Sequence, residues 1–302
     1  MQNKQLGYLL IPLLACIWGS SFILMKRGMF TTDGTAVFSA AQVASIRIFA
    51  ASSIFLPLLP KLLKNLHSPK DLLYFAVVGL GGNLIPAFLF TFAEQTLDSG
   101  IAGIMNSFTP IFTIIVGTLI FRTQITPQQL IGTLIGFSGI SWLILLSSPV
   151  KSSFELTPAL AILLATFLYG ISLNTIKHKL SKYNPIQIAT GGFSIAFLPA
   201  IISFFYFDTP RVFDQNKFAF ESFIYILILG LIGTAFAVIL FNRIIAQTTA
   251  LAASTVTYFI PIIAVAIGIY NGERFVWQQL LAMLVIITGV LLVNLKGNKS
   301  NK

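Results

Sequence analysis

Long apolar stretches separated by short polar connections run through the whole sequence. Of the 302 residues, 56% are hydrophobic and only 9% are charged, and the mean hydropathy is +0.88. A soluble domain carries roughly 25% charged residues, because its surface must be solvated. This composition therefore excludes a soluble enzyme and predicts an integral membrane protein.

Ten of these stretches approach or exceed the roughly 20 residues that an α-helix needs to cross the hydrocarbon core of a bilayer. The sequence therefore predicts an all-α membrane protein with ten transmembrane helices. The expected spans are 6–25, 35–59, 72–93, 100–121, 128–147, 157–176, 186–207, 222–242, 249–270 and 278–295.

The formal net charge of +10 predicts an orientation rather than a nucleic-acid partner, because the 19 basic residues are spread thinly through apolar sequence. With the N-terminus placed in the cytoplasm, the inner loops and termini hold 12 basic residues and one acid, and the outer loops hold 6 basic residues and 8 acids. Lys and Arg are enriched in cytoplasmic loops. We therefore expect a multi-pass protein of the inner (plasma) membrane, in contact with lipid. Both termini would be cytoplasmic, with a basic tail at 296–302.

The two halves of the sequence resemble each other at a fixed offset. Residues 74–117 align without gaps on residues 225–268 with 11 identities in 44 positions, among them three Gly pairs and the pair Pro110/Pro261. Each half has five spans, so the second copy must enter the membrane from the opposite side. The sequence predicts two inverted five-helix repeats, 6–147 and 157–295. Such repeats are typical of transporters that hold a substrate near the midplane, although a duplicated scaffold would share the pattern.

Several motifs resemble the EamA-type family of the drug/metabolite transporter superfamily. They are Trp18-Gly19-Ser20-Ser21-Phe22, the span-buried Arg47, and the paired Ala-rich helix with a proline. In that family the fourth helix of each repeat ends Pro…Glu, and a Gln and two Gly positions follow. The second half resembles this with Pro261, Glu273, Gln279 and Gly289, and the first half with Pro110, Gln129, Gly132 and Gly139, but Arg122 occupies its Glu position. The resemblance implies a ten-helix inner-membrane carrier, commonly an exporter of amino acids or other small metabolites.

Arg47 is the one charged residue that falls well inside a predicted span. A charge at the helix centre costs about 2.5–3.5 kcal/mol on insertion scales, so Arg47 should face the protein interior or water. It is a candidate contact for an anion or carboxylate, or a gate; the alternative is a structural pair with helix carbonyls or a hydroxyl. No acid is expected at mid-membrane, and Glu94, at an outer helix end, is the nearest candidate for proton coupling.

Polar residues beside prolines form the rest of the candidate site. Asn83 and Asn106 lie three and four residues before a proline, on the same helix face. A kinked helix there offers an amide and a free carbonyl to a polar or zwitterionic ligand; the alternative is hydrogen bonding between helices. The expected cavity residues are Trp18, Ser21, Arg47, Asn83, Asn106, Tyr169, Thr234, Thr257 and Tyr258, with Pro86, Pro110 and Pro261 as kink or gating positions.

Motifs for enzymatic or ATP-driven chemistry are missing from the sequence. It contains no His-Glu-x-x-His, Gly-x-Ser-x-Gly or P-loop pattern, and its single cysteine, Cys16, excludes an internal disulfide. We expect no catalytic residue, metal or cofactor. The prediction is a secondary transporter of small organic metabolites, of the amino-acid-exporter kind. The alternatives are a nucleotide-sugar or other metabolite exchanger of the same fold, or a polytopic membrane enzyme or scaffold.

Overall fold

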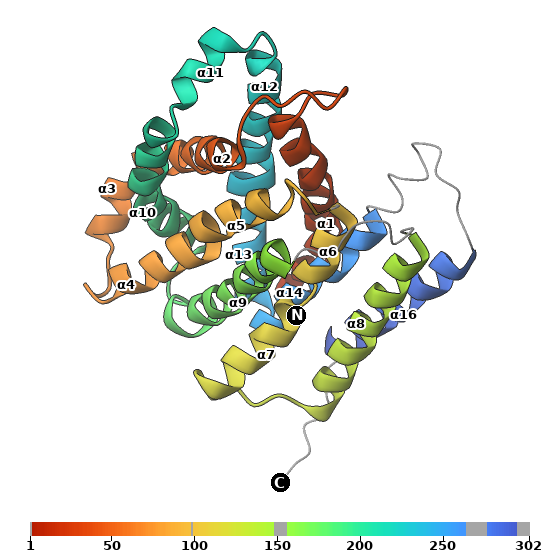
Figure 1. The fold of residues 1–302 in the computed structure, drawn as a ribbon. Coiled ribbons are helices and arrows are strands. Elements are labelled where there is room, and N and C mark those ends of the chain that lie inside the picture. The colour runs from red at the N-terminus through yellow and green to blue at the C-terminus, as the bar shows by residue number, and fades with distance from the viewer. Residues whose placement is uncertain (1, 98, 148–155, 264–276, 295–302) are drawn as a thin grey trace.

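The computed structural model describes residues 2–97, 99–147, 156–263 and 277–294, which are almost entirely helical (Figure 1). The β-pairing among these residues is a single isolated bridge between Phe30 and Ala36. The expected all-α class is therefore confirmed for the described part of the chain. The predicted tail at 296–302 and Glu273 lie outside it.

The first half of the chain forms seven α-helices before a last long one, with two irregular helical segments between them. They are α1 (Gln2–Met29), α2 (Ala40–Phe55), η1 (Leu56–Leu58), α3 (Leu59–Lys64), α4 (Asp71–Ala76), η2 (Val77–Leu84), α5 (Ile85–Ala93), α6 (Ser99–Asn106), α7 (Thr109–Leu119) and α8 (Pro127–Ser147).

The second half repeats this order, with the short helix α11 between α10 and α12 where the first half has η1 and α3 between α2 and α4. Its elements are α9 (Leu156–Lys179), α10 (Pro185–Tyr206), α11 (Thr209–Gln215), α12 (Ala219–Gly230), η3 (Leu231–Phe236), α13 (Ala237–Gln247), α14 (Ala250–Ser254), η4 (Thr255–Phe259) and α16 (Trp277–Asn294).

Six helical runs are long and apolar enough to cross a membrane, among the residues searched. Three shorter apolar helices accompany them, at Thr109–Leu119, Ala250–Ile263 and Leu280–Val293. The chain is thus a multi-pass membrane protein, but the described residues do not reproduce the ten predicted spans as ten continuous helices.

The predicted spans 100–121 and 249–270 are interrupted in their described parts. The first divides into α6 and α7 just before Pro110, and the second passes through the 3₁₀-helix η4 just before Pro261. Proline lacks an N–H group, so it is favoured at the first turn of a new helical segment. At the first break, Thr109 Oγ1 donates to the carbonyl of Asn106 at 2.7 Å and satisfies an acceptor at the end of α6.

The second helices of the two halves, α2 and α10, begin with the same capping box. The Ser39 side chain accepts from the Gln42 N–H at 3.3 Å, and the Asn184 side chain accepts from the Gln187 N–H at 2.9 Å. In both boxes the Gln side chain accepts in return from the N-cap N–H. These boxes satisfy N–H groups that a helix start leaves unpaired, and they align α2 with α10 at an offset of 145 residues.

The third helices of both halves contain a π-helical segment at matching positions. Segment η2 precedes α5 and Pro86, and η3 precedes α13. In η2 the Asn83 Nδ2 donates to the carbonyl of Val78 at 2.9 Å, and in η3 the Thr234 Oγ1 donates to the carbonyl of Leu229 at 2.9 Å. Both bonds span five residues, and they lie 151 positions apart. π-Helical turns of this kind occur frequently at functional sites.

Close packing between glycines and small residues joins the two halves. A Cβ on Gly79 would overlap the carbonyl oxygen of Gly192, and Gly82 and Gly233 lie against the hydroxyl groups of Ser172 and Ser21. The last two contacts are counterparts, 151 positions apart. Helix α1 packs on α12 and α13, and α9 packs on η2 and α5. Each repeat therefore completes its core with helices of the other.

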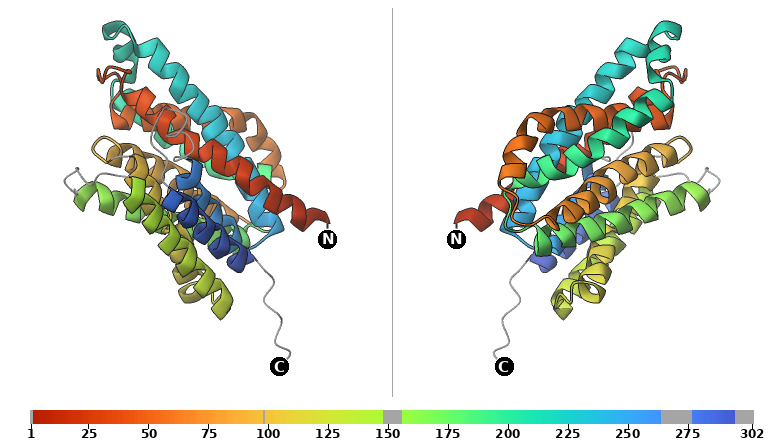
Figure 2. Two further views of the ribbon diagram at one scale, coloured as in Figure 1. Left: turned by 90° about the vertical axis from the view of Figure 1, so that its right-hand side faces the viewer. Right: turned by 90° about the vertical axis from the view of Figure 1, so that its left-hand side faces the viewer.

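Helices α8 and α16 lie side by side along one flank of the molecule (Figures 1 and 2). A Cβ added to Gly132 or Gly139 of α8 would lie 2.9 Å from a backbone atom of α16. Small residues of this kind let transmembrane helices approach closely. The pair belongs to the wall of the bundle rather than to its centre.

A polar cluster joins the two halves at the end of the bundle where α4 begins. Asp71 is buried; it accepts a hydrogen bond from the Tyr183 hydroxyl at 2.7 Å and forms an ion pair with Lys182 at 2.8 Å. The Tyr183 hydroxyl also accepts from the backbone N–H of His67 at 2.9 Å. Burial raises the pKa of the Tyr183 phenol, so it remains a donor to Asp71.

Candidate functional site

A cavity lies between the two halves and includes about 990 Å³ of space free of protein atoms, part of it open to solvent. Nine lining residues of the first half each have a lining counterpart 151 positions later. The pairs are Trp18/Tyr169, Ser21/Ser172, Phe22/Leu173, Met25/Ile176, Gly82/Gly233, Asn83/Thr234, Phe90/Phe241, Asn106/Thr257 and Thr109/Ile260. The cavity therefore sits where the two repeats face each other.

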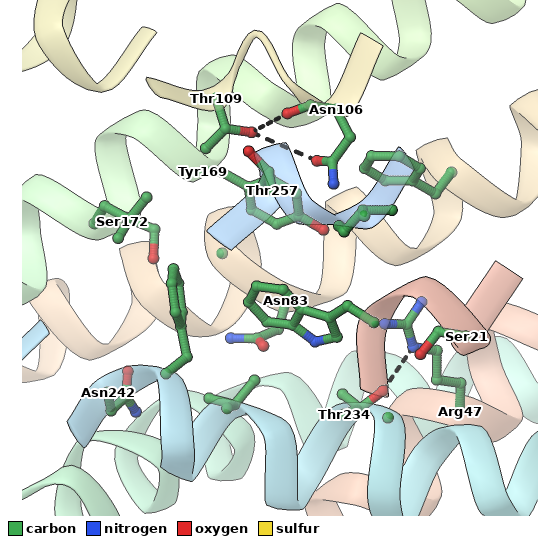
Figure 3. A pocket seen from close by; sticks show the side chains of 18 of the residues that line it. Ser21, Arg47, Asn83, Asn106, Thr109, Tyr169, Ser172, Thr234, Asn242 and Thr257 are labelled. Atoms are coloured by element: carbon green, nitrogen blue, oxygen red, sulfur yellow. Dashed lines mark hydrogen bonds between the residues drawn. The ribbon is translucent and has the colours of Figure 1, made fainter. Parts of the chain in front are cut away.

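Eight of the nine residues expected around a cavity line this one. They are Trp18, Ser21, Arg47, Asn83, Asn106, Tyr169, Thr234 and Thr257, and Figure 3 shows most of them. The structure brings them together; whether they bind a substrate remains a prediction.

Tyr258 differs from the expectation and lies outside the cavity. Its side chain is fully buried in the cluster formed by α8 and α16, and its hydroxyl donates to the carbonyl of Thr133 at 3.0 Å. The ring packs over Gly136, where a side chain would leave no room. The preceding residue, Thr257, lines the cavity. Successive residues of a helix point about 100–120° apart, so Tyr258 faces α8 and α16 instead.

The expected gating prolines all lie just after a change of helix type or a break in the helix. Pro86 is the second residue of α5, which directly follows η2; Pro110 is the second residue of α7, after the break from α6; and Pro261 lies two residues after the end of η4. The irregular backbone at these positions is an observation; gating there remains a prediction.

Arg47 reaches the cavity from α2. Its Nε donates to Thr234 Oγ1 at 2.7 Å, and Thr234 in turn donates to Leu229 in the π segment η3 (Figure 3). The described residues supply no hydrogen-bond acceptor for the other guanidinium N–H groups. A guanidinium with free N–H groups can bind a carboxylate through two parallel hydrogen bonds.

Arg47 also breaks the symmetry of the cavity. With α2 and α10 aligned by their capping boxes, its counterpart is Gly192, which packs against Gly79. Arg47 is the one charged side chain among the described residues that line the cavity. The cavity thus has one cationic side and no matching charge on the other.

Aromatic rings pack in two counterpart pairs beside the polar groups. Trp18 meets Phe241 edge to face at 4.9 Å between ring centroids, and Tyr169 stacks on Phe90 at 6.0 Å. The pairs are related by the offset of 151 residues. Such rings offer apolar surface to the carbon skeleton of a small organic ligand.

Asn242 and Thr109 also line the cavity, although they were not predicted. Asn242 is 1% exposed, and its Nδ2 donates to the carbonyl of Pro185 at 3.3 Å. The sequence prediction ended a span at residue 242, whereas α13 continues to Gln247. The internal repeat could have placed Asn242 inside its helix, because its counterpart Thr91 is a polar residue inside a predicted span.

Glu94 lies at the end of α5, outside the cavity lining. It is 1% exposed, and neither carboxylate oxygen has a hydrogen-bond partner in the described part of the chain. Arg47 and Lys26 are the cations whose charges act on it. Its repeat counterpart is Ile245, so this buried acid is confined to the first repeat.

Known proteins resemble this chain over nearly its whole length. An uncharacterised transporter of Archaeoglobus fulgidus is 23% identical over 287 residues, covering 95% of this chain and 98% of its own. A Streptantibioticus cattleyicolor protein named a probable terminal-alkyne amino-acid exporter is 23% identical over 290 residues, covering 92% and 89% of the two chains.

A solved structure shares the fold. A crystal structure superimposes with a TM-score of 0.68 at 12% identity and covers 94% of both chains. At that identity the likeness concerns the fold alone.

The two repeats each match the same family model. The model of the EamA-like transporter family matches residues 5–145 and again residues 156–295, which is nearly all of the chain. Together with the paired lining residues of the central cavity, this double match shows that the chain belongs to the EamA-like transporter family.

Proposed function

We propose that this protein exports small, amino-acid-like metabolites by alternating access between its two inverted repeats. The observation that carries the proposal is Arg47, which Thr234 holds against a cavity whose other described lining residues are uncharged. We assign to Arg47 the binding of a substrate carboxylate, and to Asn83, Asn106, Thr257 and the aromatic pairs the rest of the substrate. The name of the Streptantibioticus relative supports the substrate class and the direction.

The interrupted helices support the alternating-access part of the proposal. In secondary transporters with inverted repeats, discontinuous helices surround the substrate near the midplane. Here the π segments and the breaks before Pro110 and Pro261 occur at matching positions of both repeats. We place the protein in the inner (plasma) membrane with both termini cytoplasmic, on the distribution of its Lys and Arg residues.

The alternatives receive less support. A nucleotide-sugar exchanger must bind a diphosphate, for which Arg47 alone supplies little charge. A membrane enzyme or a scaffold fits less well with membership of a transporter family.

Glu94 is the proposed site of proton coupling. A buried acid without a hydrogen-bond partner inside a membrane protein is a candidate for a proton relay. The charges of Arg47 and Lys26 nearby would link its protonation to substrate binding.

The test is a counterflow and efflux assay in liposomes with purified protein. Vesicles are loaded with a panel of labelled amino acids and assayed with and without a pH gradient. We expect efflux of at least one compound, its loss in Arg47→Ala, and loss of the response to the pH gradient in Glu94→Gln. Undiminished flux in Arg47→Ala at equal protein content would overturn the assignment of Arg47.

A further inference from the structure

The cavity has a second polar end, which the proposed function leaves unused. Asn242 lies there on α13, and Ser172 lies on the same side of the cavity. Figure 3 shows both on the opposite side of the cavity from Arg47 and Thr234.

The side-chain oxygen of Asn242 is a buried acceptor without a partner. Its Nδ2 donates to the carbonyl of Pro185, which fixes the amide orientation, because the reversed amide would place two oxygens against each other. Its Oδ1 has no hydrogen-bond partner in the described part of the chain. Unsatisfied buried polar atoms are rare in native proteins and call for an explanation.

Among the described side chains that have a buried polar atom without a hydrogen-bond partner, Asn242 is the one that lines the cavity. The remaining ones are on residues that do not line the cavity, namely Ser52, Glu94, Ser194, Thr209 and Gln247. Its unpaired oxygen is therefore the one that a cavity ligand could reach by a small side-chain adjustment.

The spacing between the two ends restricts the ligand. Thr234, which holds Arg47, and Asn242 lie eight residues apart on one helical run. At about 1.5 Å per residue, this separates their α-carbons by about 12 Å along the helix. In an α-amino acid the carboxylate and the ammonium group are bonded to the same carbon atom. They are therefore too close together for one to reach Arg47 while the other reaches Asn242.

We propose that Asn242 is a specificity-determining residue, whose Oδ1 accepts a hydrogen bond from the far end of a substrate whose carboxylate is bound by Arg47. The inference rests on the proposed function and narrows its substrate class to elongated zwitterions, such as ω-amino acids and short peptides. An ammonium donor is favoured, because charge-assisted hydrogen bonds are the stronger ones.

Lys177 brings a positive charge to the same end of α13. It donates to the carbonyl oxygens of Ile245 and Thr248, and those carbonyls carry the partial negative charge of the helix C-terminus. Because this charge could weaken the binding of an ammonium group, the test includes a variant that adds a compensating carboxylate at position 242.

The test measures the binding of matched ligands to the full chain in detergent by isothermal titration calorimetry. The ligands are 6-aminohexanoate, hexanoate, which lacks the terminal donor, and 3-aminopropanoate, whose two groups are too close together to span the cavity. The proteins are wild type, Asn242→Leu, Asn242→Asp, Arg47→Ala, and Thr91→Val as the control. Thr91 is the counterpart of Asn242; it donates to Ala87 in its own helix and does not line the cavity.

Wild type should bind 6-aminohexanoate about ten-fold more tightly than hexanoate, the factor expected for one charge-assisted hydrogen bond. Asn242→Leu should abolish that preference without changing hexanoate or 3-aminopropanoate binding. Asn242→Asp should increase the preference, and Thr91→Val should leave it unchanged.

Equal binding of 6-aminohexanoate and hexanoate by wild type, or a preserved preference in Asn242→Leu, would overturn the inference. If the Leu variant does not fold, an Asp variant without the preference overturns it equally. In these cases hexanoate binding that is lost in Arg47→Ala leaves the proposed function standing. Hexanoate binding that survives in Arg47→Ala overturns both. No binding of either ligand by wild type overturns the inference alone, because the efflux panel tests the proposed function with other compounds.

Discussion

The two repeats line the central cavity with nine matched pairs of residues, yet three polar groups in the cavity or near it, Arg47, Asn242 and Glu94, have no such match. Arg47 corresponds to Gly192, Glu94 to Ile245, and Asn242 to Thr91. The matched positions supply the shape of the cavity, its aromatic pairs and its π segments. The unmatched positions supply a cation, a buried acid and an unpaired acceptor. The comparison separates a symmetric scaffold from the chemistry placed on it.

The two ends of the bundle also differ, because the polar groups that are present at one end are absent at the counterpart positions of the other. At one end Asp71, Lys182 and Tyr183 join the repeats through an ion pair and a buried hydrogen bond. At the other end the counterpart of Asp71 is Ser222, and those of Lys182 and Tyr183 are Val37 and Phe38, which belong to an apolar cluster. One end is therefore held by polar contacts and the other by apolar packing.

Removing the unmatched cation should have the largest effect on transport. Arg47→Ala should lower the efflux rate about 100-fold, since truncating a charged binding partner costs several kcal/mol. Arg47→Lys should be intermediate, because Lys keeps the charge but cannot bind a carboxylate with a planar fork. The measurement is efflux from liposomes at matched protein content. Gly192→Ala is the control at the counterpart position, where an added Cβ would meet Gly79 at no less than 3.4 Å.

Crowding the contact between the repeats should have the largest effect on stability. In Gly79→Ala the new methyl group would overlap the backbone of Gly192, which should cost about 2 kcal/mol. Gly230→Ala should cost less, because its closest contact is the Arg47 carbonyl at 2.8 Å. Gly81→Ala, whose nearest atom lies 3.9 Å away, should be neutral. Thermal unfolding in detergent checks the order; equal stability of the three variants would contradict it.

Removing the charge of Asp71 tests the difference between the two ends. Asp71→Asn keeps an acceptor for Tyr183 but loses the ion pair with Lys182, whose side chain is 40% exposed. The expected loss of stability is about 1 kcal/mol, reduced by solvent screening of the exposed partner. Ser222→Ala, at the counterpart position, should cost less. A larger loss in the Ser222 variant than in the Asp71 variant would contradict the assignment.

The two π segments should respond unequally to the loss of their side-chain hydrogen bonds. Asn83→Leu removes one intrahelical bond, and an average membrane hydrogen bond of about 0.6 kcal/mol corresponds to about a three-fold loss of substrate affinity. Thr234→Val removes the matching bond and also the partner of Arg47, so its loss should be greater. Titration with the best substrate of the efflux panel measures both. Equal losses would mean that Thr234 does not position Arg47.

Most of the candidate site could be predicted because the repeat doubles each local signal. Asn83 and Asn106 were found beside prolines, and their counterparts Thr234 and Thr257 followed from the alignment. Tyr258 and Asn242 show where this reasoning fails. Tyr258 packs between α8 and α16 while its neighbour Thr257 faces the cavity, and Asn242, at the predicted end of its span, lines the cavity within α13, which continues to Gln247.

Composition alone determined that the chain enters a membrane, because the bilayer selects long apolar stretches by local sequence. The internal repeat determined that two halves face each other, and the cost of burying a charge predicted that Arg47 avoids lipid. The tertiary structure decided the rest: where the helices change type, which residues meet across the repeats, and which polar atoms are left without partners. Those features depend on contacts between residues far apart in the sequence, such as Gly82 with Ser172, 90 positions apart, and Arg47 with Thr234, 187 positions apart. Such contacts form only once helices of both halves pack together.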